Sequence, residues 1–121
     1  MTIRRLKTYS GSLGYVYQYY FVGKRVKPAA AGLALGGDEY IFDVTSDRKM
    51  TYAVSIFLPQ SSVAQWQQSH GRTLSDSEKY AAAKMRLFRA FDESEGIQSH
   101  GREMQIDVDF LEASLSGLGV D

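Results

Sequence analysis

The sequence predicts an α+β fold: a four-stranded, mainly antiparallel sheet with two helices packed on one face. Three observations lead to this prediction. The first half of the chain holds three strand-like runs, two helix signals follow, and a late run alternates strictly between polar and apolar residues. The predicted order of elements is therefore β-β-β-α-α-β.

The three N-terminal strands are predicted from residue type and alternation. Residues 13–26 are rich in aromatic and β-branched residues and read as a long first strand. Residues 27–38 contain one proline and three glycines, which predicts a long Gly/Ala-rich loop whose alanines are compatible with a helical turn. Residues 39–45 and 50–58 are predicted to pair as a hairpin across a polar turn. Their core faces are expected to carry Tyr40, Phe42, Val44, Tyr52, Val54, Ile56 and Leu58.

Two helices are predicted from their end signals. Pro59 suits the start of a short helix, and Gly71 suits its C-terminal cap. Ser75 and Glu78 have the spacing of a capping box, which predicts a longer helix running to about Glu93.

The last strand is predicted over residues 103–110, where polar and apolar residues alternate without a break. Its core face would carry Met104, Ile106, Val108 and Phe110. The tail at 112–121 gives only a weak signal for a short helical turn.

Length and composition predict one domain over residues 1–121, with residues 1–10 as a basic arm. The hydrophobic content of 44% is ordinary for a globular domain, and the absence of cysteine excludes disulfides and thiolate metal sites. No signal peptide and no membrane span are recognisable, so a cytoplasmic location without membrane association is expected.

The zero net charge hides an asymmetry between the chain ends. Residues 1–30 carry six basic and no acidic side chains, whereas residues 92–121 carry eight acidic side chains and one basic. Such asymmetry is typical of a basic arm for nucleic acid. The alternative is that the acidic last strand pairs with the basic first strand and the charges neutralise each other.

The first strand is apolar on both faces. One face carries Tyr15, Tyr17, Tyr19 and Phe21, and the other carries Val16, Gln18, Tyr20 and Val22. Because only one face meets the helices, an exposed aromatic patch is expected, and such patches usually mark an interface. The candidate interface residues are Tyr15, Tyr17, Tyr19, Phe21 and Phe57.

The peptide Gln-Ser-His-Gly-Arg occurs twice, at 68–72 and 98–102. Shared capping requirements explain the repeat, because glycine and basic residues favour helix C-termini. The alternatives are coincidence and a site in which His70, Arg72, His100 and Arg102 converge on an anion or perform acid–base chemistry.

Lys84 is the remaining candidate for a polar site, because helical rotation places it within the apolar stripe of the long helix. Either its stem packs while the amine reaches water, or the amine meets a carboxylate such as Asp43 or Asp107 in a pocket. Glu103, Asp107 and Asp109 share one predicted strand face, but no ligand spacing supports a metal site, and no metal or cofactor is expected.

These features favour a small non-enzymatic interaction module that acts as a homodimer through an aromatic sheet face. One alternative is nucleic-acid binding by the tyrosine-rich strand with the N-terminal basic residues at its rim. Another is a small-ligand binder or enzyme that uses the His/Arg pairs.

Overall fold

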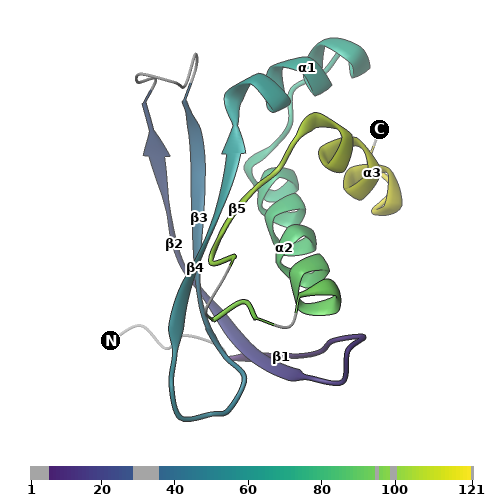
Figure 1. The fold of residues 1–121 in the computed structure, drawn as a ribbon. Coiled ribbons are helices and arrows are strands. Elements are labelled where there is room, and N and C mark those ends of the chain that lie inside the picture. The colour runs from purple at the N-terminus through teal and green to yellow at the C-terminus, as the bar shows by residue number, and fades with distance from the viewer. Residues whose placement is uncertain (1–5, 29–35, 95, 99–100, 121) are drawn as a thin grey trace.

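The structure is a computed structural model that describes residues 6–28, 36–94, 96–98 and 101–120. Over these residues the chain forms one mixed sheet of five strands with three helices on one side (Figure 1). The α+β class is confirmed, but the sheet has five strands rather than four, and the helices number three rather than two. His100 and most of the predicted loop at 27–38 lie outside the described residues.

The strands are β1 (Lys7–Ser10), β2 (Val16–Lys27), β3 (Gly37–Thr45), β4 (Tyr52–Pro59) and β5 (Glu103–Gln105), and the helices are α1 (Gln60–His70), α2 (Asp76–Glu93) and α3 (Val108–Gly117). The strands lie side by side in chain order. Neighbours are antiparallel from β1 to β4, and β5 is parallel to β4. The predicted hairpin of the second and third strands is present as β3 and β4.

The N-terminal segment is not only a basic arm, because Lys7–Ser10 forms the edge strand β1. Tyr9 fixes this strand to α2: its ring stacks on Phe88 at 4.5 Å, and its hydroxyl donates to Asp92 at 2.8 Å. A four-residue strand anchored by one aromatic residue is too short for alternation to reveal it.

The predicted strand over 103–110 is wrong beyond Gln105. Asp107 is the N-cap of α3, and its carboxylate accepts the backbone N–H of Phe110 at 2.8 Å. Leu111 and Leu115 then recur at helical spacing and are fully buried. The spacing of Val108 and Phe110 is compatible with both a strand and a helix. The capping aspartate and the later leucines are compatible with a helix alone.

The predicted pairing of the acidic last strand with the basic first strand is also wrong, since the predicted first strand is β2, which pairs with β1 and β3, whereas β5 pairs with β4. The cations of β2 are instead paired within their own hairpin. Lys24 lies 3.9 Å from Asp38, and Arg25 and Lys27 both contact Glu39 on β3.

The tyrosine face of β2 packs against α2 and forms an aromatic layer of the core. Tyr17 stacks on Phe91 with ring centres 4.1 Å apart, and Phe21 meets Tyr80 edge-on at 4.9 Å. The predicted core faces of the next two strands are buried as expected. The opposite face of β2, which includes Gln18, points away from the helices.

Both predicted helix boundaries with capping signals are confirmed. Gly71 follows α1 with a left-handed φ of 68°, and its N–H donates to the carbonyl of Gln67. Ser75 and Glu78 form a complete capping box at the start of α2.

Candidate functional site

The side of the sheet that faces away from the helices is the candidate binding surface (Figure 1). We call it the helix-free face. A β-bulge between Phe21 and Gly23 reverses the alternation of β2, so Arg25 and Lys27 lie on this face although Tyr19 and Phe21 lie on the other. The register brings Arg25, Glu39, Phe57 and Gln105 into one row across four strands, beside a row containing Ile41, Ser55 and Glu103.

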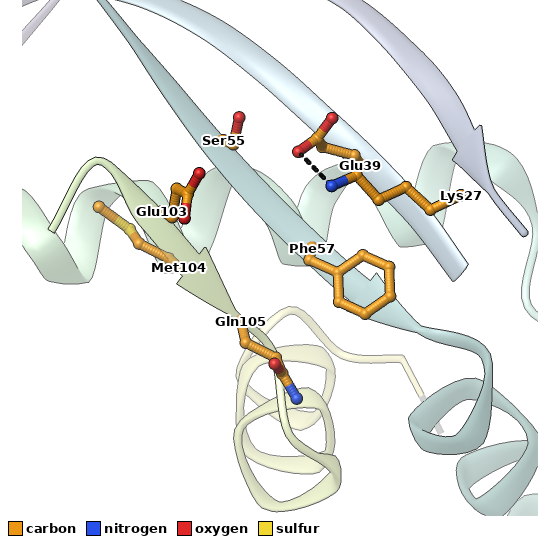
Figure 2. A pocket seen from close by; sticks show the side chains of 7 residues that line it. All are labelled: Lys27, Glu39, Ser55, Phe57, Glu103, Met104 and Gln105. Atoms are coloured by element: carbon orange, nitrogen blue, oxygen red, sulfur yellow. Dashed lines mark ion pairs between the residues drawn. The ribbon is translucent and has the colours of Figure 1, made fainter. Parts of the chain in front are cut away.

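A pocket of about 250 Å³ is hollowed into the helix-free face (Figure 2). It is lined by Lys27, Glu39, Ser55, Phe57, Glu103, Met104 and Gln105. Figure 2 shows Glu39, Ser55 and Glu103 extending from the same side of the sheet, with Lys27 reaching over to Glu39. Three adjacent strands, β3, β4 and β5, therefore supply most of the lining.

Glu39 is the buried charge of this site. It is only 5% exposed, yet its carboxylate contacts Arg25 Nε and lies 3.4 Å from Lys27 Nζ. Burial raises the pKa of Glu39, but the hydrogen bond from Arg25 and the charge of Lys27 outweigh burial and hold the pKa below its usual value. Glu39 is thus ionised at neutral pH and leaves one surplus positive charge on the β2 side of this face.

Glu103 lies at the other side of the pocket, on β5. Its side chain is exposed, and it forms no ion pair or hydrogen bond with any described residue. The helix-free face therefore carries a surplus cation on its β2 side and, within the described part of the chain, an unpaired carboxylate on its β5 side.

Most of the residues predicted to form an aromatic interface are packed against the helices rather than exposed together on one surface. Tyr17 and Tyr19 are buried under α2, and Phe21 packs against the same helix. Tyr15 precedes β2 and is exposed, whereas Phe57 is half-buried on the helix-free face. The stacking platform expected for nucleic acid is thus part of the core, because the rings gain more from burial against α2 than from exposure.

Of the described residues of the predicted His/Arg site, His70 and Arg72 both contact the ring of Trp66, whereas Arg102 lies elsewhere. His70 Nε2 lies 2.8 Å from Glu112 on α3, and its ring stacks on Trp66 at 4.0 Å. Arg72 binds the capping carboxylate Glu78 with both terminal nitrogens.

Arg102 occupies the other end of the sheet. It lies over the ring of Tyr52, the first residue of β4, whereas α1 follows the last residue of that strand. Gly71 caps α1, whereas Gly101, although also left-handed, lies just before β5 and well after α2 has ended at Glu93, so helix capping accounts for the first copy of the repeated peptide and not for the second. His100 lies outside the described residues, so its part in the predicted site stays untested.

Lys84 has no carboxylate partner of the predicted kind. Asp43 accepts the hydroxyl of Tyr20 on the opposite face of the sheet, and Asp107 caps α3. The amine lies instead 5.9 Å from the Tyr80 ring centre and 5.8 Å from that of Phe88. Burial lowers the pKa of Lys84, and the nearby charge of Lys7 lowers it further.

The acidic residues of the C-terminal segment do not form a common face. Glu103 is on β5, whereas Asp107 and Asp109 belong to the start of α3. Across the described residues, no group of three histidine, cysteine or acidic side chains is arranged to hold a metal ion. None of the helices in that part of the chain is long and apolar enough to cross a membrane.

Sequence reasoning did not identify Arg25, Lys27, Glu39 and Gln105 as residues of the helix-free face. A signal was available for two of them, since Arg25 and Lys27 alternate along one strand. The bulge that moves them to the helix-free face leaves no sequence mark that alternation detects, apart from Gly23.

No protein-family model, no curated protein and no solved structure matches this chain.

Proposed function

We propose that this protein is a non-enzymatic interaction module that forms a homodimer through the helix-free face of its sheet. The observation that carries the proposal is the charge pattern of that face. Arg25 and Lys27 against Glu39 leave a positive charge at the β2 side, and Glu103 supplies a negative charge at the β5 side. A surface that carries opposite charges on its two sides is complementary to a second copy of itself.

One symmetry satisfies this complementarity. A two-fold axis that lies in the interface and runs parallel to the strands places β2 of one copy over β5 of the other, twice. Each Glu103 then meets the Arg25 and Lys27 of the partner copy. An axis perpendicular to the strands would stack β2 on β2 and oppose like charges, which costs energy.

The centre of the face provides apolar contact for such a dimer. Ile41 and Phe57 lie on β3 and β4, between the charged residues of β2 and Glu103 on β5, and both are half-buried in the single chain. Sheets that pack face to face leave about 10 Å between them, which side chains of this size fill. The polar rim and apolar centre match the usual anatomy of an interface.

Sedimentation velocity over a series of protein concentrations tests the proposal. We expect a monomer–dimer equilibrium that Glu103→Lys weakens roughly tenfold, since exposed ion pairs contribute about 0.2–1 kcal/mol each and the symmetry repeats the contact. Added salt should weaken the dimer as well, because the charged pairs lie at its rim.

Glu93→Lys is the matched control, because it makes the same charge change on α2, on the helix side of the sheet. We expect it to leave the dimer unchanged. A chain that stays monomeric at every concentration, or a dimer that Glu93→Lys weakens as much as Glu103→Lys does, would contradict the proposal.

A further inference from the structure

Lys7 and Lys84 bring two amines together on the helix side of the sheet. Lys7 pairs with Tyr19 across β1 and β2, and it lies two residues from Tyr9 on the same face of β1. Both tyrosines contact Phe88 of α2, with ring centres 4.5 Å and 5.6 Å from that of Phe88. Lys84 precedes Phe88 by about one helical turn, so it lies on the same side of α2. The two amines are within hydrogen-bond reach of each other.

The amine of Lys84 lies in an apolar setting. The residue is half-buried, and its Nζ is 5.9 Å from the Tyr80 ring centre and 5.8 Å from that of Phe88. Charges interact more strongly beside apolar side chains than in open water, so the repulsion between the two amines is only partly screened. This repulsion and burial both lower the pKa of Lys84. A ligand of opposite charge would relieve it.

No carboxylate in the described part of the chain forms an ion pair with either amine. Asp92 lies about two turns after Lys84 on α2, and it accepts the hydroxyl of Tyr9. On β3, Asp38 pairs with Lys24. The two amines therefore form a site with two positive charges and no counter-ion from these residues.

We propose that Lys7 and Lys84 together bind a phosphate group that carries two negative charges, either free phosphate or a phosphate monoester. Lysine is a common phosphate ligand and acts as a point charge. A doubly charged oxyanion matches two ammonium groups, and its oxygens can accept a hydrogen bond from each. A carboxylate or a phosphodiester has a single charge and would leave one of the two positive charges uncompensated. The site is on the helix side of the sheet and does not depend on dimer formation.

The test is an amide ¹H–¹⁵N chemical-shift titration with inorganic phosphate at about pH 8, where phosphate is doubly charged, and at constant ionic strength. We expect shifts centred on Lys7 and Lys84. Lys84→Met keeps an unbranched side chain and removes the charge, so phosphate affinity should fall about tenfold or more, and Lys7→Met should act similarly. Lys79→Met is the matched control, because it makes the same change at an exposed position on another side of α2, and it should leave the affinity unchanged.

Two phosphate esters test the charge and the source of the ligand. Dimethyl phosphate carries one charge, so it should bind about tenfold or more weakly than inorganic phosphate. Methyl phosphate is a doubly charged monoester, and its binding should also require both lysines. Methyl phosphate that binds as tightly as inorganic phosphate would assign the site to a monoester, and weaker binding would assign it to free phosphate.

Urea unfolding gives a second readout. Phosphate should raise the unfolding midpoint of wild type and of Lys79→Met more than that of Lys84→Met, because a ligand that binds the folded state stabilises it. The difference between the variants is the relevant quantity, since phosphate also stabilises folded proteins non-specifically. Three results would overturn the proposal: phosphate shifts that do not involve the two lysines, equal phosphate affinity in wild type and Lys84→Met, or dimethyl phosphate that binds as tightly as inorganic phosphate.

Discussion

Replacement of Tyr17 by alanine tests the assignment of the tyrosine face of β2 to the core. Tyr17 is 3% exposed, and its ring stacks on Phe91 at 4.1 Å with the planes 8° apart. Truncation of a large buried aromatic residue costs about 3–5 kcal/mol, and the stacked pair adds about 0.5–1.5 kcal/mol of coupling. Domains of this kind have a total unfolding free energy of about 5–15 kcal/mol, so the loss would be a large share of it.

Urea unfolding followed by the fluorescence of Trp66, the single tryptophan, measures this loss. A double-mutant cycle of Tyr17→Ala with Phe91→Ala isolates the stacking energy. Phe57→Ala is the control on the helix-free face, where the ring is only half-buried, and it should cost less than half as much. If Tyr17→Ala is no more costly than Phe57→Ala and instead changes the oligomeric state, the tyrosine face is an interface and the reasoning fails.

Two further predictions concern charged side chains of α2. The hydrogen bond from Arg72 and the N–H of Ser75 lower the pKa of Glu78 from 4.5 to about 2. Since the folded pKa lies below the unfolded one, Glu78 stabilises the fold above pH 4.5, and this contribution disappears as the pH falls towards 2. The stability difference between wild type and Glu78→Gln in urea at pH 7 should therefore vanish near pH 2, and a difference that persists there would contradict the linkage. Lys84→Met should raise the midpoint of urea unfolding, because it removes both the burial of an amine and the repulsion of that amine by Lys7. The increase should be clearest at low salt, where the repulsion is least screened. A lower midpoint would show that the contacts of the amine with the two neighbouring rings are net stabilising.

Local signals were sufficient for much of the fold. The capping box of Ser75 and Glu78, the left-handed Gly71 and the alternation of Tyr40, Phe42 and Val44 each depend on residues within a few positions of one another. Such features are decided by backbone geometry and by the two-residue period of a strand, which any context preserves. The sequence by itself therefore determined the α+β class, the first two helices and the core face of the central hairpin.

Long-range contacts decided the rest. Both faces of β2 are apolar enough to be buried, and only the rings of α2 select the face that carries Tyr17. Strand β1 depends on the contact of Tyr9 with residues about 80 positions away, and the end of β5 depends on Asp107 capping a helix whose leucines reach the core. The order of strands across the sheet likewise follows from tertiary packing. The opposite charges of the two chain ends did not predict which strands pair, because basic residues can find acidic partners elsewhere. Arg25 and Lys27, for example, pair with Glu39.

The same distinction applies to the pocket on the helix-free face. Alternation predicted that Phe57 and Tyr40 lie on opposite faces of the sheet. No sequence signal showed that Glu103 would lie two strands from Glu39 across the sheet. A pocket is formed by residues from several elements, so its lining is fixed only when the elements pack, and packing is a property of the whole chain.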